Sequence, residues 1–312
     1  MSDNNSEPLV SVITPTYNRS GLLKRAISSV LNQTYQNLEM IIIDDCSTDD
    51  TEQLVNDVND SRIKYEKLET NMGAPAARNY GISTAKGDYI SLLDSDDGYL
   101  QNKLELQMKR FQELPQYVGV VYCGYYIVYE PDTIHGKVLP QYKGDIFKTL
   151  LKHNCMGSPT PLIRKECFDV CGLFDESLPS CQDWDMWIRI SEKFEFDFVN
   201  ELLAKTYTHG NQISTNIKNK IQAREILIDK YRDQTNEFPD TKAYLLQKLG
   251  FLYLLDKHRF KSRKYYLKSI LANPMDFENY MILLTSLLSK TNHMNRMKGS
   301  SIREENNIIV YF

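Results

Sequence analysis

The sequence predicts an α/β fold with a mixed, mainly parallel sheet flanked by helices, followed by an all-helical C-terminal region. Short apolar stretches alternate with amphipathic helices over the first 95 residues, and the connections between them are short. The stretch 38–43 is mainly apolar, as expected for a strand covered by helices on both faces. Aspartates follow two of the predicted strands, at 44–45 and 94–97. This alternation indicates right-handed βαβ units.

The predicted elements can be placed in order along the chain. Strands are expected at 9–14, 38–43, 62–65 and 89–93, and helices at 20–33, up to 59 and at 76–85. Ser47 and Asp50 have the spacing of a capping box for the second of these helices. Further on, we expect helices at 101–114, 145–153 and 182–194, a long aromatic strand at 118–130, and short strands at 196–199 and 203–206.

Composition narrows the class of protein. The hydrophobic content of 42% and charged content of 25% are ordinary for a soluble globular chain of 312 residues. A formal charge of −4 argues against a nucleic-acid-binding surface spread over the molecule. The first eight residues lack an apolar signal core, and no apolar run reaches the roughly 18 residues of a membrane span. Six widely spaced cysteines without a Cys-x-x-Cys pair favour reduced thiols. We therefore expect a cytoplasmic protein.

The stretch Asp94–Ser95–Asp96–Asp97 is the strongest local signal. Three carboxylates lie within four residues at the end of a predicted strand, where they repel one another. Hard divalent cations take oxygen ligands from Asp, and ligands bind at strand ends in open α/β sheets. The alternative is an acidic turn that caps the helix starting near Gln101.

Six stretches in a fixed order carry a family resemblance. They are 10–19 (VSVITPTYNR), 43–49 (IDDCSTD), 71–81 (NMG followed by ARNYG), 94–97 (DSDD), 182–189 (QDWD with Trp187 and Arg189) and 209–214 (HGNQIS). Together they resemble the inverting family 2 glycosyltransferases, which have the GT-A fold. Two positions depart from the usual pattern, because Gly is commoner at Cys46 and Glu at Gln182.

The resemblance implies a nucleotide-sugar donor, commonly a UDP-sugar, and the residues that would bind it. Pro15, Tyr17 and Arg19 belong to the base-binding turn, Tyr17 and Pro15 offering a stacking surface, and Asp45 would accept the N3–H of the base. The remaining donor residues would be Arg78, Asp94 and Asp96. Mg²⁺ or Mn²⁺ would be held by Asp96 or Asp97, and His209 would either ligate the metal or contact a phosphate. The alternatives are a packing role for Tyr17, a surface ion pair for Arg78 and simple exposure for His209.

The motif around residue 183 would supply the chemistry at the acceptor. Inversion needs one carboxylate to take the proton of the acceptor hydroxyl, and Asp183 is the candidate base. A general acid is not needed, because a metal-bound diphosphate leaves readily. Trp184 and Asp185 would contact the acceptor, a glycan or a lipid-linked molecule. The alternative for Trp184 and Trp187 is helix packing.

We expect three regions: a catalytic domain at 8–214, a helical extension at 215–290 and a polar, mobile tail at 291–312. Within the extension, one segment resembles a single tetratricopeptide repeat, with members Leu246, Leu249, Gly250, Tyr253, Ser262, Tyr266, Ser269 and Pro274. A lone repeat needs a packing partner, so the extension would pack on the catalytic domain, on another protein or on a second copy. The apolar stretch 280–290 with the basic residues after it suggests either internal packing or a contact with the inner face of the membrane.

The leading hypothesis is a metal-dependent, inverting, hexosyltransferase-type enzyme of cell-surface polysaccharide synthesis. The alternative is a sugar-nucleotide or glycan-binding protein that has lost catalysis, which the departures at Cys46 and Gln182 leave open. Two further hypotheses are a scaffold that acts through its helical extension and a nucleotidyltransferase, which would leave Asp183 without a role.

Overall fold

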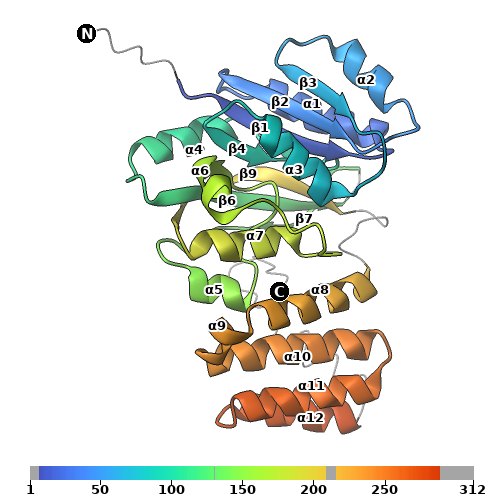
Figure 1. Cartoon of the computed structure of the whole chain (residues 1–312), viewed down its shortest axis with the longest axis vertical. Coiled ribbons are helices and arrows are strands. Elements are labelled where there is room, and N and C mark those ends of the chain that lie inside the picture. The colour runs from blue at the N-terminus through green and yellow to red at the C-terminus, as the bar shows by residue number, and fades with distance from the viewer. Residues whose placement is uncertain (1–6, 130, 209–215, 289–312) are drawn as a thin grey trace. The chain divides into compact units, whose positions relative to one another are not determined.

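The computed structural model describes residues 7–129, 131–208 and 216–288 (Figure 1). Contacts divide the chain into two units. The sheet unit comprises Met1–Ile146, Cys155–Glu176 and Arg189–Thr208, and the helical unit comprises Phe147–Asn154, Ser177–Ile188 and His209–Phe312. The helical unit thus takes two segments from within the predicted catalytic domain. The boundary expected at residue 214 stays a prediction.

The described part of the sheet unit forms one nine-stranded sheet. Its main path has the order β3-β2-β1-β4-β8-β6-β9-β5, and β7 pairs with β6. The strands β3, β2, β1 and β4 are all parallel. The remaining pairs are antiparallel except for β6 with β9. The bounds are β1 Val10–Thr16, β2 Leu38–Asp44, β3 Ile63–Lys67, β4 Tyr89–Leu92, β5 Gly98–Tyr99, β6 Val118–Tyr129, β7 Thr133–Val138, β8 Leu162–Arg164 and β9 Glu195–Thr208.

The second half of the sheet differs from the expectation. The two short strands expected near 196–206 are one long strand, β9, which bulges where Asn200 and Glu201 have no partner on β6. These two polar residues resemble a loop in the sequence, but a bulge accommodates them within a continuous strand. The strands β5, β7 and β8 are short or exposed, so their hydrophobic pattern is too weak to predict them.

Helices cover both faces of the sheet. The sheet unit contains α1 (Ser20–Leu31), α2 (Thr51–Val58), α3 (Ala74–Thr84), α4 (Lys103–Gln112) and α6 (Glu166–Cys171). The core on one face joins the buried sides of α1 and α4 to Val10 and Val12 of β1. Side chains alternate along a strand, so Ile13 points to the other face, where α3 approaches it closely. A Cβ at Gly81 would lie 2.5 Å from Ile13 Cγ2, so α3 needs glycine there.

The capping box expected from Ser47 is not formed. Ser47 Oγ accepts the backbone N–H of Asn18, and Asp49 Oδ1 accepts the N–H of Thr51 at the start of α2. The spacing of a capping box is short and common, and here a contact from the turn after β1 takes the serine.

The helical unit consists of α5 (Phe147–Lys152), most of α7 (Gln182–Ser191), α8 (Ile217–Lys230), α9 (Arg232–Asn236), α10 (Pro239–Leu255), α11 (Arg259–Ala272) and α12 (Phe277–Leu288). The helices α10 and α11 pack closely because Gly250 makes room for the ring of Tyr266, which a Cβ would approach to 2.7 Å. Ser262 and Ser269 are buried, as small residues of a close helix pair should be. The likeness to a tetratricopeptide repeat stays a prediction.

Two expectations from the sequence, reduced cysteines and the absence of a membrane span, can be compared with the structure. All six cysteines lie in the described residues and carry free thiols. Among the described helices, none has the length and apolarity needed to cross a bilayer. In α12, Ile282 is buried against Tyr266, whereas Met281 and Leu284 are 41% and 47% exposed. Internal packing therefore accounts for one side of this apolar helix.

Candidate active site

The predicted donor residues follow two neighbouring parallel strands. Strand β1 lies between β2 and β4, so the strand order reverses beside β1. In open α/β sheets, ligands bind outside the carboxyl ends of the strands at such a reversal. Tyr17 and Arg19 follow β1 directly, and the DSDD stretch at 94–97 follows β4 after one residue. The topology therefore brings the two predicted donor stretches to one edge of the sheet.

Arginines hold the acidic stretch in place. Arg19 Nη1 lies 2.9 Å from Asp96 Oδ2, and Arg25 in α1 donates to the backbone carbonyl of Asp96 at 2.6 Å. Arg78 in α3 donates to Asp94 Oδ1 at 2.5 Å, and its side chain is only 10% exposed. Arg78 is therefore not part of a surface ion pair. Three motifs that are separate in sequence meet in these contacts.

Asp97 is deeply buried, and within the described residues it makes no ion pair of this kind. Its Oδ1 accepts the backbone N–H of Tyr207 in β9 at 3.0 Å. Burial raises the pKa of Asp97 well above its ordinary value, and the charges of Asp96 and Asp94 raise it further. A divalent cation would relieve this crowding of hard oxygen donors, so these residues fit Mg²⁺ or Mn²⁺. The described residues contain no assembled group of three His, Cys, Asp or Glu ligands, and His209, the third predicted ligand, lies outside them.

Asp45 and Tyr17 have different surroundings. Both carboxylate oxygens of Asp45 accept backbone N–H groups, from Met72 at 2.7 Å and Gly73 at 2.8 Å. Asp45 thus fixes the turn that opens α3, while each oxygen keeps a lone pair for a base. Tyr17 is 45% exposed, which excludes a buried packing role, and Pro15 is buried within β1.

The departure at residue 46 has a backbone consequence. Cys46 has a φ of +69°, in the left-handed region that glycine adopts without steric cost. This conformation explains why glycine suits the position. Cys46 keeps the turn after β2 and carries a small strain.

In the helical unit, the candidate base lies in the first turn of α7. Asn154, which follows α5, donates from Nδ2 to Asp183 Oδ2 at 3.0 Å. The side chain of Asp183 is half-buried, so part of it faces solvent. An oriented, accessible carboxylate of this kind can accept a proton.

Trp184 and Trp187 are core residues of the helical unit. They are 4% and 0% exposed, and Trp184 Nε1 donates to the carbonyl of Leu150 at 2.6 Å. Both tryptophans pack α7 into its unit, which is the packing alternative. The predicted acceptor contact of Trp184 stays a prediction, and little of the ring is open to an acceptor.

Asp185 forms a buried polar cluster with the end of α8. Its side chain is 0% exposed, and Oδ1 lies 2.8 Å from Lys230 Nζ and 2.8 Å from the hydroxyl of Tyr231. A buried carboxylate with a cation and a hydroxyl is well compensated, and removing either would leave it unsatisfied. The acceptor role of Asp185 stays a prediction that would require this cluster to open. The described contacts make Asp185 one of the links between α7 and α8.

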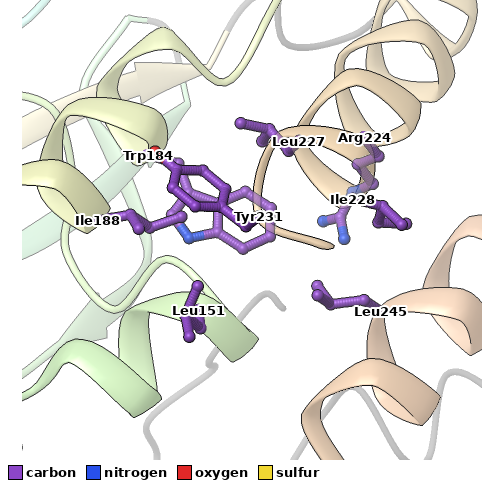
Figure 2. Close-up of a pocket in the computed structure, with 8 residues that line it drawn as sticks. All are labelled: Leu151, Trp184, Ile188, Arg224, Leu227, Ile228, Tyr231 and Leu245. Atoms are coloured by element: carbon purple, nitrogen blue, oxygen red, sulfur yellow. The ribbon is translucent and has the colours of Figure 1, made fainter. Parts of the chain in front are cut away.

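A small cavity lies beside this cluster, lined by residues of α5, α7, α8 and α10 and by Tyr231 (Figure 2). The residues are Leu151, Trp184, Ile188, Arg224, Leu227, Ile228, Tyr231 and Leu245. Its volume of about 10 Å³ is at most enough for one water molecule. The cavity is a packing defect and has no room for a sugar or a lipid chain.

Comparison with known proteins decides the family. The family described as "Glycosyl transferase family 2" matches residues 11–169. This chain belongs to glycosyl transferase family 2. The predicted family, and with it the prediction of a glycosyltransferase, is therefore confirmed.

Family 2 relatives are similar over most of the chain. A glycosyltransferase of Rickettsia typhi is 35% identical over 273 residues, which cover 81% of this chain and 84% of the relative. A Bacillus subtilis protein named as a teichuronic acid biosynthesis glycosyltransferase, TuaG, is 34% identical over 68% of this chain and 84% of its own length. An Escherichia coli protein named as a colanic acid biosynthesis glycosyl transferase, WcaA, is 34% identical over 73% of this chain and 83% of its own length.

Solved structures confirm the GT-A fold. Staphylococcus aureus TarS 1-349 in complex with UDP-GlcNAc superposes with a TM-score of 0.67 at 18% identity, over 94% of this chain and 93% of that one. The mannosyltransferase PcManGT of Pyrobaculum calidifontis, in complex with GDP-Man and Mn²⁺, gives a TM-score of 0.62 at 15% identity, over 95% and 85%. At these identities the likeness concerns the fold.

Several residues that contact the candidate residues of each unit were not predicted from the sequence. Arg25 and Tyr207 support the acidic stretch, Asn154 contacts the candidate base, and Lys230 and Tyr231 hold Asp185. None of them belongs to a recognisable motif. An acid within an apolar helix, such as Asp185, was the one available sign of these contacts. A buried acid implies a partner, but only the fold shows where in the chain that partner lies.

Proposed function

We propose that this family 2 enzyme transfers a sugar, with inversion, from a UDP-sugar to a hydroxyl of a glycan or lipid-linked acceptor in the synthesis of a cell-surface polysaccharide. The observation that carries the proposal is the DSDD stretch at the strand reversal, held by Arg19, Arg25 and Arg78. The names of TuaG and WcaA support the polysaccharide, and the UDP-GlcNAc of the TarS complex supports the donor.

On the donor side, the exposed ring of Tyr17 would stack on the base, and Asp45 would accept its N–H. Arg19 and Arg78 lie where a diphosphate would need positive charge. Asp96 and Asp97, with His209, would hold Mg²⁺ or Mn²⁺. When bound, the cation would neutralise the leaving diphosphate.

On the acceptor side, Asp183 would take the proton of the attacking hydroxyl. Asn154 would orient its carboxylate toward the hydroxyl. The contacts of Asp185 with Lys230 and Tyr231 would keep the first turns of α7 rigid.

Calorimetric titration of the whole chain with UDP, with and without Mn²⁺, tests the donor site. We expect UDP binding that requires Mn²⁺ and that becomes at least about tenfold weaker in an Asp96→Asn, Asp97→Asn variant. Asparagine preserves the shape of each side chain but removes the charge. Asp57→Ala, an exposed carboxylate on α2, is the matched control and should bind like the wild type.

The results separate the parts of the proposal. Tight UDP binding without Mn²⁺ would contradict the metal requirement alone. If the wild type bound no UDP under either condition, the proposed donor would be wrong. Release of UDP from UDP-sugars in the presence of candidate acceptors would then identify the transferred sugar.

A further inference from the structure

Two cations on α8 have no acidic partner among the described residues. Lys220 and Arg224 are four residues apart, so they lie next to each other on one side of the helix. Both are half-buried, and neither makes an ion pair within the described part of the chain. Lys230 on the same helix, by contrast, is paired with Asp185. Like charges at this spacing destabilise a helix unless an anion lies between or above them.

This cation pair lies beside the start of α7. The guanidinium carbon of Arg224 is 5.1 Å from the centre of the Trp184 ring, and Trp184 follows Asp183 in sequence. The thiol of Cys181, the residue before α7, is close enough that the charges of Arg224, Asp183 and Lys220 all act on its pKa. Burial raises that pKa, so the thiol stays neutral and does not pair with the cations. The cations and the candidate base therefore surround the same turn.

Among the described residues, a further lysine adds to the positive charge around the pair. Burial lowers the pKa of Lys220, and the charge of Arg224 lowers it further. Lys248 of α10 has its pKa lowered to about 8, by burial first and then by Arg224, with Glu278 acting in the opposite direction. Residues 209–215, which precede α8, include no acid in their sequence. A local excess of positive charge in a chain of net charge −4 points to an anionic ligand.

We propose that Lys220 and Arg224 bind a phosphate group carried by the acceptor, next to the hydroxyl that Asp183 deprotonates. This inference rests on the proposed role of Asp183. A phosphate matches the site because it carries up to two negative charges and several acceptor oxygens. An arginine can bind two of those oxygens at once, while the lysine adds a point charge. The 10 Å³ cavity next to Arg224 is too small for the ligand, so the phosphate would lie on the outer side of the guanidinium.

The chain contains two tryptophans, both in α7, which gives a direct optical probe. Inorganic phosphate is titrated at low ionic strength into the full chain with saturating UDP and Mn²⁺, which occupy the donor site. Phosphate on Arg224 should change the tryptophan fluorescence, because this guanidinium lies over Trp184. The Lys220→Gln, Arg224→Gln variant should bind phosphate at least about tenfold more weakly. Lys218→Gln, which removes one positive charge at an exposed site of α8, should bind it like the wild type.

Several outcomes would overturn the proposal. Equal phosphate affinity in the wild type and the double variant would remove Lys220 and Arg224 from the site. Acetate binding as tightly as phosphate would overturn the choice of phosphate. Because the fluorescence of the double variant could change for other reasons, thermal unfolding is the second measurement. Phosphate should raise the midpoint of the wild type and of Lys218→Gln but not that of the double variant.

Two further comparisons complete the test. Binding of the protein to vesicles that contain phosphatidic acid, compared with vesicles of phosphatidylcholine, shows whether the phosphate lies on a lipid. Vesicle binding that requires Lys220 and Arg224 assigns the phosphate to a lipid. Binding of soluble phosphate without vesicle binding assigns it to a glycan. UDP binding separates this inference from the proposed function. Intact UDP binding with phosphate binding unaffected by the double substitution would refute this inference alone, whereas absent UDP binding would refute the proposed donor alone.

Discussion

The two regions that carry the predicted chemistry have opposite charge balances. In the sheet unit, three carboxylates crowd the DSDD stretch, and even with Arg19 and Arg78 in contact the pKa of Asp97 is raised. In the helical unit, Asp185 is fully compensated, while Lys220 and Arg224 have no acidic partner in the described chain. The first region is short of positive charge and the second has an excess of it. The comparison suggests a cation for one region and an anion for the other.

The largest expected effect comes from replacing the candidate base, Asp183. If this replacement did not slow transfer, the helical unit would lose its proposed chemical role and the comparison would fail. Asp183→Asn keeps the shape of the side chain but cannot take a proton. We expect the transfer rate to fall by roughly 10³-fold with UDP affinity unchanged, because general base catalysis is worth about 10² to 10⁴. Rates of UDP release and calorimetry measure the two quantities. Loss of UDP binding in this variant would contradict a role confined to the acceptor.

The next effect tests whether Lys230 compensates the buried charge of Asp185. Lys230→Met removes the cation beside the buried carboxylate of Asp185, and we expect it to lower the free energy of unfolding by about 3 kcal/mol in urea titrations. Adding Asp185→Asn should recover part of the loss, because no buried charge then remains. Lys218→Met on the same helix is the control. A loss that is simply additive in the double variant would show that the two side chains do not interact.

The dependence of stability on pH gives a further test of the helical unit, through His153, which follows α5. Burial lowers its pKa to about 4, with Lys152 of α5 and Lys248 of α10 adding repulsion. The unfolded chain binds a proton near pH 6.5 and the folded chain only near pH 4, so stability is lost as the pH falls between these values. We expect a loss on the order of 2 kcal/mol, seen as a falling urea midpoint. The loss should be absent in His153→Gln and present in His135→Gln, which changes an exposed histidine.

The smallest effect concerns the turn after β2 in the sheet unit. Cys46→Gly removes the steric penalty of a φ of +69°, and we expect a gain of about 0.5–1 kcal/mol in the free energy of unfolding. Cys46→Ala keeps the penalty and should give no gain. If alanine stabilised the fold as much as glycine, the effect would come from losing the thiol and not from the backbone.

Much of the sheet unit could be predicted from the sequence. Its three parallel strand pairings follow from apolar strands that alternate with amphipathic helices, and motifs mark the ends of β1, β2 and β4. The positions of Asp45 and Asp96 at one sheet edge follow from the same pattern. Parallel sheets can be recognised in a sequence because their strands are apolar and their functional residues lie at the strand ends.

The supports of the site could not be predicted in the same way. Arg25 lies on α1 without a motif, and its contact with Asp96 spans 71 residues of sequence. Asp45 was assigned to the base alone, yet it also holds the backbone of Met72 and Gly73. Lys230 and Tyr231 end an unremarkable helix. Such contacts depend on how the helices and strands pack in the fold. The periodicity of a single sequence predicts helices and strands but not these distant contacts.

The cluster of Asp185, Lys230 and Tyr231 also limits how genes for such enzymes can recombine. A single crossover after β9 would join the α7 of one parent to the α8 of another, and Asp185 would face whatever residues that second parent supplies at 230 and 231. The hybrid would contain a buried acid without a matched partner. A functional exchange would instead transfer segments 147–154 and 177–188 together with everything after β9, since these three pieces form one unit. Hybrid libraries built on this chain should respect the five junctions that bound these three pieces, and not one.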